Sequence, residues 1–146
     1  MSSNALQLTV VPADFAGLRE RLIAIRKQVF VAEQGIPLEI ELDERDVHCR
    51  HVLVVADGTD VGTGRIDIER GGRIGRVAVL KTWRRRGVGE AVMQGLHDIA
   101  RAAGLARVYC HAQESAVPFY LSLGYQAEGE SFLEVGIVHL PLALKL

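Results

Sequence analysis

Residues 74–112 hold the pattern that most strongly constrains how this chain can fold. Two apolar runs, 74–80 and 106–112, flank a segment at 88–103 whose apolar residues recur every three to four positions. The runs have the length of strands, and the recurrence indicates an amphipathic helix that Gly104 ends. A strand, helix and strand of this size form a right-handed crossover. The two strands are therefore predicted to be parallel neighbours in one sheet.

The rest of the chain predicts more strands and two more helices. An alternating run at 6–11 indicates a half-buried strand, and Asp14 can cap a helix that fades near Gly35. Ser115 can cap a short helix that Gly124 ends. Further strands are expected at 51–56 and 61–69, which lead through glycine turns into 74–80, and two more within 125–144. Residues 36–50 are expected to be mostly loop.

Composition predicts a single domain over residues 1–146 and excludes several classes of function. A chain of 146 residues that is 49% hydrophobic can bury one core. The formal net charge of -1 argues against nucleic acid or a membrane as partner. Two cysteines and no long apolar run favour a cytoplasmic location. His48, Cys49 and His51 lack the spacing of metal ligands, so no metal is predicted.

The segment Trp83-Arg84-Arg85-Arg86-Gly87-Val88-Gly89 joins the predicted strand to the predicted helix. Glycine lets a backbone approach a ligand closely, and the free N–H groups at a helix N-terminus attract anions. The arginines add charge that can reach further phosphates. The segment matches neither a Walker loop nor a dinucleotide fingerprint, and by itself it is equally typical of a plain turn.

Three matches together resemble one family. The run R-x-x-G-x-G at 84–89 resembles the acetyl-CoA signature of the GNAT superfamily of N-acetyltransferases. The segment 113–125, Q-x-x-A-x-x-F-Y-x-x-L-G-Y, resembles a second family motif, in which Asn is more usual than Gln113. The segment 29–37, with His139, resembles a bacterial subgroup of the ElaA and YjcF type.

The resemblance implies an α+β fold and a binding site for acetyl-CoA. The fold would be a mixed, mostly antiparallel sheet of about six to seven strands, flanked by helices and splayed between strands 74–80 and 106–112. The donor would lie in that cleft, with its pyrophosphate on the loop and its pantetheine arm along the strand. The residues implied in binding are Val77, Ala78, Val79, Arg84, Arg85, Arg86, Gly87, Val88, Gly89, Gln113 and Phe119.

The implied activity is transfer of an acetyl group to a primary amine by direct attack in a ternary complex. Such a reaction needs donors for the oxyanion and an acid for the departing thiolate. Tyr120 matches the family's acid, and the N–H of Val77 would serve the oxyanion. The acceptor is left open among small metabolites, aminoglycosides, peptide N-termini and protein lysines.

The general base is the least determined part of this hypothesis. Many family members carry a glutamate on the strand before the loop, whereas this strand offers only Arg73 and Arg76. We favour Glu33, because it ends the first helix beside an acidic stretch that could receive a cationic amine. The other candidates are His51, His111, Glu134, His139 and an ordered chain of water.

Three alternatives stay open on the sequence. Cys110 could act as a nucleophile, although His111 should point to the opposite face of the strand. The chain could instead bind acyl-CoA as a sensor or docking module without turnover. The strand at 137–144 could pair across a homodimer.

Overall fold

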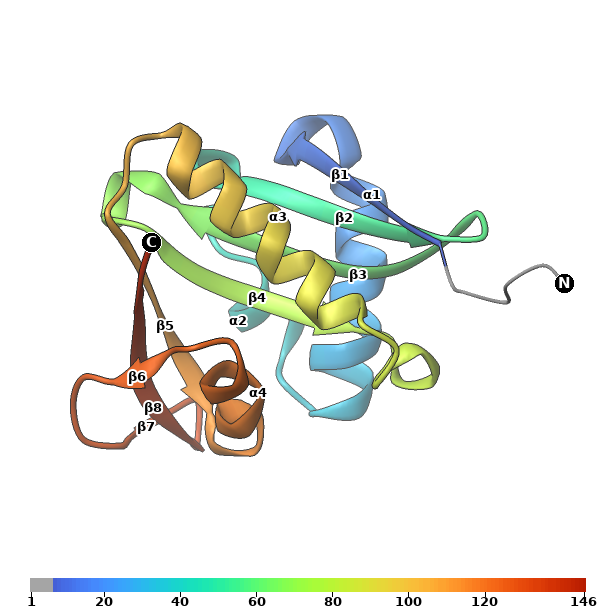
Figure 1. The fold of residues 1–146 in the computed structure, drawn as a ribbon. Coiled ribbons are helices and arrows are strands. Elements are labelled where there is room, and N and C mark those ends of the chain that lie inside the picture. The colour runs from blue at the N-terminus through green and yellow to red at the C-terminus, as the bar shows by residue number, and fades with distance from the viewer. Residues whose placement is uncertain (1–6) are drawn as a thin grey trace, which may run out of the picture.

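A computed structural model describes residues 7–146. Within that range the chain forms one mixed sheet of eight strands with helices on both faces (Figure 1). The strand order is β1-β2-β3-β4-β5-β8-β6, and β7 also pairs with β8. The strands are β1 (Leu8–Asp14), β2 (Arg50–Ala56), β3 (Thr59–Asp67), β4 (Arg73–Val79), β5 (Arg107–Gln113), β6 (Gln126–Ala127), β7 (Phe132–Glu134) and β8 (Ile137–Lys145).

Four α-helices accompany the sheet in the described range. They are α1 (Phe15–Arg26), α2 (Leu38–Glu41), α3 (Val88–Ala102) and α4 (Val117–Ser122). A π-helix, Lys27–Glu33, continues α1 without a break. Asp14 caps α1 as predicted, since its Oδ1 accepts the N–H of Gly17 at 2.9 Å.

The predicted α+β fold and its crossover are confirmed. β4 and β5 form a parallel pair, and every other strand pair of the described sheet is antiparallel. The helix between them, α3, lies across one face of the sheet, and α1 lies across the other (Figure 1). Each helix buries its apolar stripe against the strands, which produces two separate clusters of core side chains.

Three local predictions need correction. Ser115 does not cap α4, because it lies inside a 3-10 turn, Glu114–Ala116, that runs directly into the helix. Residues 125–144 hold three strands rather than two, since the short β6 is invisible to periodicity. The first strand was expected at 6–11, but β1 continues to Asp14; Leu6 lies outside the described residues.

β4 and β5 separate soon after they meet. Their register pairs only Arg73 with Tyr109 and Ile74 with Cys110, after which the strands diverge (Figure 1). Arg76 has a φ of 50°, and the register of β4 against β3 shifts at this point. An irregular residue of this kind bends a strand and re-aims the residues that follow it. The far half of β4 therefore has no strand on the side that faces β5.

A buried ion pair network fastens the segment between α2 and β2. Arg26 is only 1% exposed, and its guanidinium donates to Glu41 Oε1 at 2.6 Å and to Asp46 Oδ1 at 2.8 Å. Arg65 of β3 donates to the same Asp46 oxygen at 2.8 Å and to Asp43 at 2.7 Å. This segment has little regular structure, as predicted, but it is held by charge pairs.

The aspartates of this network have lowered pKa values. Burial opposes ionisation of Asp46, yet the hydrogen bonds from Arg26 and Arg65 hold its pKa below the ordinary value. At Asp43 burial is again outweighed, and the hydrogen bond from Arg65 lowers the pKa to about 2. Both carboxylates are therefore ionised at neutral pH.

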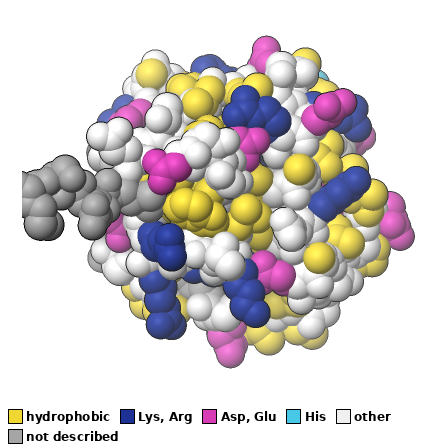
Figure 2. Space-filling model, turned by 90° about the vertical axis from the view of Figure 1, so that its right-hand side faces the viewer, with side chains coloured by type: hydrophobic (Ala, Val, Ile, Leu, Met, Phe, Trp, Pro, Cys, Tyr) yellow, Lys and Arg dark blue, Asp and Glu magenta, His cyan; other side chains and the backbone are white. Residues whose placement is uncertain are grey.

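On the face shown in Figure 2, basic side chains in dark blue and acidic ones in magenta both occur, and neither forms a continuous stripe. No helix among residues 7–146 is long and apolar enough to cross a membrane. β8 is an inner strand of the described sheet, flanked by β5 on one side and by β6 and β7 on the other. The predicted dimer through 137–144 thus lacks a free edge, while a homodimer by another surface stays a prediction.

Replacing Arg26 with Leu should destabilise the protein by about 3 to 5 kcal/mol, because Glu41 loses the buried partner of its charge. Urea unfolding at neutral pH measures this loss. Arg21→Gln is the matched control, since Arg21 pairs with Asp60 at the surface and should barely move the midpoint. Equal effects of the two changes would contradict a structural role for the buried network.

Acid should weaken the fold through the same aspartates. Their folded pKa values lie below the value of about 3.9 for an unfolded aspartate. Their stabilisation is complete above about pH 4 and should be lost as the pH falls towards about 2. Urea midpoints measured across this interval should drop less steeply in Asp43→Asn than in the wild type. Parallel curves would show that other groups cause the acid sensitivity.

Candidate functional site

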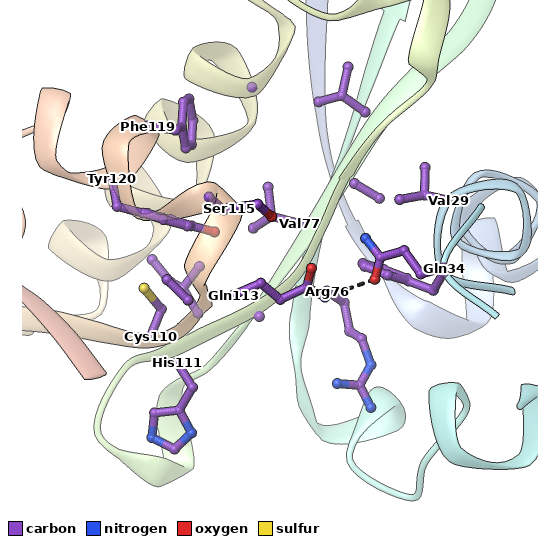
Figure 3. A pocket seen from close by; sticks show the side chains of 18 of the residues that line it. Val29, Gln34, Arg76, Val77, Cys110, His111, Gln113, Ser115, Phe119 and Tyr120 are labelled. Atoms are coloured by element: carbon purple, nitrogen blue, oxygen red, sulfur yellow. Dashed lines mark hydrogen bonds between the residues drawn. The ribbon is translucent and has the colours of Figure 1, made fainter. Parts of the chain in front are cut away.

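A large cavity opens where β4 and β5 diverge (Figure 3). Its volume is about 760 Å³, a size that suits a small-molecule site. β4 and β5 form its walls, the starts of α3 and α4 close one end, and residues 29–41 and the β7–β8 turn border the other. Tyr120 and Gln113 are directed into this space from the β5 side, and Gln34 faces them from the other (Figure 3).

The N-terminus of α3 presents unpaired N–H groups to one end of this cavity. Gly87 is the N-cap with a φ of 83°, and no side chain caps the helix. The first N–H groups of a helix have no partner within it. Arg85 also has a positive φ, 62°, so successive N–H groups around the turn converge as in an anion-binding nest. The loop can therefore hold a phosphate group by its backbone.

The three arginines of the loop have different surroundings. Arg84 donates to both carboxylate oxygens of Glu33, at 3.0 and 2.8 Å, and to the carbonyl of Val79 at 3.0 Å. Arg86 stacks over the Trp83 ring at 5.1 Å and does not line the cavity. Only Arg85 combines a side chain without a partner among the described residues with a place at the cavity.

Glu33 lies apart from the reaction space predicted for it. Its carboxylate is occupied by Arg84, and it is not among the residues that line the cavity. The geometry gives no support to Glu33 as the general base. The pair instead ties the end of the first helix to the loop, across 51 positions of sequence.

The other predicted loop residues shape the site through packing. Gly89 lies so close to the Phe119 ring that an added Cβ would meet it at 3.1 Å. Both residues line the cavity. Val88 is buried in the core beneath α3, so only its backbone is available to a ligand. Ala78 is 2% exposed and packs towards α1.

The free side of β4 offers main-chain groups to the cavity. Leu80 donates its N–H to the carbonyl of Val61 in β3 at 2.9 Å. Because the backbone groups of successive strand residues point to opposite sides, the N–H and C=O groups of Val79 and Val77 point towards the gap. The Val79 carbonyl accepts a hydrogen bond from Arg84. The N–H of Val79 and the N–H and C=O of Val77 are then available to a ligand. An extended ligand with amide groups could pair with them as a strand does.

Gln113 spans the cavity rather than lying along one wall. Its Nε2 donates to Oε1 of Gln34 at 2.8 Å (Figure 3). Gln113 ends β5, and Gln34 follows the π-helix, so the bond links the two sides of the gap. The prediction that Gln113 meets a ligand here stays a prediction, but the side chain is in the required place.

Tyr120 of α4 reaches the cavity with its hydroxyl. The residue is 7% exposed, packs edge-on against Phe119 and Tyr125, and points its oxygen towards β4 (Figure 3). Burial, together with the nearby Cys110, raises the pKa of this phenol well above its ordinary value. Tyr120 therefore keeps its proton at neutral pH, so its hydroxyl is available as a proton donor.

Cys110 is not set up as a nucleophile. Burial raises the pKa of its thiol to about 12, so almost none is ionised at neutral pH. His111 points away from it, to the opposite face of β5 (Figure 3). The alternative of a cysteine nucleophile therefore has no support in the geometry.

A polar cluster lines the face of the cavity opposite Tyr120. Arg73 donates to Nδ1 of His111 at 3.1 Å and lies 3.5 Å from Glu134. His139 of β8 completes the group, with its Nδ1 at 2.7 Å from the carbonyl of Ile137. Burial and the charge of Arg73 lower the pKa of His111. We call Arg73, His111, Glu134 and His139 the polar wall.

Two further expectations are corrected by these contacts. The acids expected to collect a cationic amine are already paired, since Glu41, Asp43 and Asp46 all bond to arginines, although Glu41 borders the cavity. His51 is 1% exposed and bonds to the Asp46 carbonyl, away from the cavity. Among residues 7–146, no cluster of His, Cys, Asp and Glu could hold a metal ion.

Sequence reasoning missed the bridge residue Gln34 and the joining of Arg73 to Glu134. Gln34 lies inside the matched segment 29–37, so that segment was the available signal. The contact between Arg73 and Glu134 joins β4 to β7, which lie far apart in the sequence, so no local pattern indicates it.

Comparison with known proteins identifies the family. The sequence profile of the acetyltransferase (GNAT) domain matches residues 28–146. The uncharacterised N-acetyltransferase YjcF of Bacillus subtilis is 39% identical over 120 residues, which cover 81% of this chain and 86% of that protein.

Solved structures agree with this. An acyl-CoA N-acyltransferase from Pseudomonas aeruginosa has a TM-score of 0.82 at 28% identity and covers 94% of this chain and 99% of that one. Escherichia coli ElaA has a TM-score of 0.81 at 27% identity, with the same coverage. The predicted likeness to the ElaA and YjcF type is confirmed, and the chain belongs to the GNAT acetyltransferase family.

Proposed function

We propose that this protein transfers an acetyl group from acetyl-CoA to a primary amine. The observation that carries the proposal is one cavity in which three features meet: the free N–H groups of α3, the unpaired side of β4 and the hydroxyl of Tyr120. The family uses acyl-CoA, which supplies the donor class.

The donor's pyrophosphate fits the loop 84–89. The N–H groups of Gly87, Val88 and Gly89 meet the anion at the positive end of the helix dipole. Arg85 adds a side-chain charge, whereas Arg84 is neutralised by Glu33. The loop therefore binds phosphate mainly through its backbone, and Glu33 with Arg84 acts as a positioning pair.

The rest of the donor follows β4 towards the polar wall. The two groups of Val77 and the N–H of Val79 can pair with the pantetheine amides and the thioester carbonyl. An N–H aimed at that carbonyl stabilises the oxyanion formed when an amine attacks. Gln113 and Phe119 lie beside this path.

Tyr120 supplies the proton for the leaving group. When the amine attacks, the C–N bond forms, the C–S bond breaks, and its electron pair goes to sulfur. The thiolate then takes the phenolic proton, which Tyr120 carries at neutral pH. The acceptor amine approaches from the side of the polar wall, where the cavity carries both signs of charge.

Gly87→Val should abolish coenzyme A binding in isothermal calorimetry, because a β-branched residue cannot keep the positive φ that aims the N–H groups. Gly58→Val is the matched control. Its φ is 77°, an added Cβ also meets open space there, and it lies in the β2–β3 turn. Both variants should lose similar thermal stability, while only Gly87→Val loses binding. Unchanged affinity in Gly87→Val would refute the pyrophosphate assignment.

Tyr120→Phe should lower turnover by about ten- to a thousandfold while leaving coenzyme affinity nearly unchanged, since only the hydroxyl is removed. Thiol release is measured with acetyl-CoA and four amine classes: spermidine, kanamycin, a peptide with a free N-terminus and one with an internal lysine. Tyr109→Phe is the control, because its hydroxyl bonds to Arg70 outside the cavity.

The same assay separates the enzyme from a sensor. Tight coenzyme binding without thiol release for any amine would favour a non-catalytic acyl-CoA-binding module. Equal rates in the wild type and Tyr120→Phe would make Tyr120 a packing residue.

A further inference from the structure

His139 differs from the other basic candidates in how its ring is held. It lies on β8, is 7% exposed and lines the cavity. Its Nδ1 is 2.7 Å from the carbonyl oxygen of Ile137. A carbonyl can only accept, so Nδ1 carries the hydrogen and donates it. In the neutral ring the lone pair is therefore on Nε2.

That Nε2 atom is not fully buried. Among residues 7–146, no group bonds to it, and no fully buried side-chain nitrogen or oxygen lacks a partner. An unpartnered Nε2 must then have accessible surface, and His139 borders the cavity. The stacked ring of Phe132, with centroids 5.9 Å apart, fixes the orientation of the imidazole.

The other titratable groups of the region are already engaged. Nδ1 of His111 accepts from Arg73, whose positive charge opposes its protonation. Glu134 lies between the same arginine and histidine, at 3.5 and 3.7 Å. The lone pair of His139 is the basic site in the polar wall that has no partner among the described residues.

We propose that His139 is the general base of the acyl transfer, an assignment that rests on the proposed function. Its Nε2 takes a proton from the acceptor ammonium, directly or through one water, and leaves a neutral amine. The amine nitrogen attacks the thioester carbon, and the thiolate takes the proton of Tyr120. The amide nitrogen then returns one proton to Tyr120 through water, and His139 releases its own to solvent.

The hydrogen bond to the carbonyl of Ile137 orients the imidazole ring of His139. When Nε2 gains a proton, the Nδ1–H bond becomes charge-assisted and holds the imidazolium in place. Glu134 can stabilise the resulting positive charge, while Arg73 and His111 oppose it. The polar wall thus combines a proton acceptor with one compensating carboxylate.

NMR can identify the tautomer of His139 without a measurement of activity. In a long-range ¹⁵N–¹H NMR spectrum of the labelled full chain at neutral pH, His139 should show protonated Nδ1 and unprotonated Nε2. The signals are assigned by their loss in His139→Asn, whose amide can still donate to Ile137. A protonated Nε2 in the wild type would overturn the assignment of the base, whatever the enzyme does.

Steady-state kinetics test whether His139 acts as the base. The acceptor is the amine, among the four classes assayed, that gives the highest rate. His139→Asn should lower kcat/KM by about 10²- to 10⁴-fold and leave coenzyme A affinity unchanged in calorimetry. His139→Ala should be partly rescued by added imidazole, which a purely structural role would not allow. His48→Asn is the control, because that exposed histidine lies outside the cavity.

The outcomes distinguish a failure of the proposed base from a failure of the proposed acetyltransferase activity. Wild-type turnover that His139→Asn leaves intact would overturn the base and preserve the acetyltransferase. Loss of turnover at unchanged coenzyme A affinity in Glu33→Gln, but not in His139→Asn, would return the base to Glu33. No turnover in the wild type would overturn both, whereas loss and rescue confined to His139 support the proposal.

Discussion

The brief pairing of β4 with β5 is the constraint on which the rest of the site depends. Two residue pairs join the strands at Arg73 and Ile74, and the bulge at Arg76 then turns β4 away. If the two strands had stayed paired, the backbone N–H and C=O groups of Val77 and Val79 would have bonded to β5. Divergence leaves them unpaired and opens the cavity, while α3 delivers its N-terminus to one end.

Much of this arrangement could be predicted from local sequence, because its causes are local. The crossover follows from periodicity at 74–112, and the proposed anion site rests on Gly87 at the start of a helix. Contacts between distant segments could not be predicted in this way. Nothing in the spacing of Glu33 indicates Arg84, and the acids between α2 and β2 look free until Arg26 and Arg65 are placed beside them.

The same distinction explains the choice of base. From the sequence, Glu33 was favoured over four other side chains only by its place beside an acidic stretch, since residue type alone says nothing of hydrogen-bond partners. The structure separates them by what already occupies their atoms: Glu33 and Glu134 face arginines, His51 bonds to a carbonyl in the core, and His111 accepts from Arg73. His139 differs because its backbone partner occupies the nitrogen that donates and leaves the accepting one open.

The hydrogen bond between Gln113 and Gln34 crosses the cleft at a place where a ligand could bind. Each side chain ends in a primary amide, chemically close to a peptide group, and together they span the gap left by the missing strand contacts. A ligand arm that carries amides of its own can take over these partners one for one. Under the proposed function, binding of the donor would then replace one amide hydrogen bond across the gap with others of the same kind.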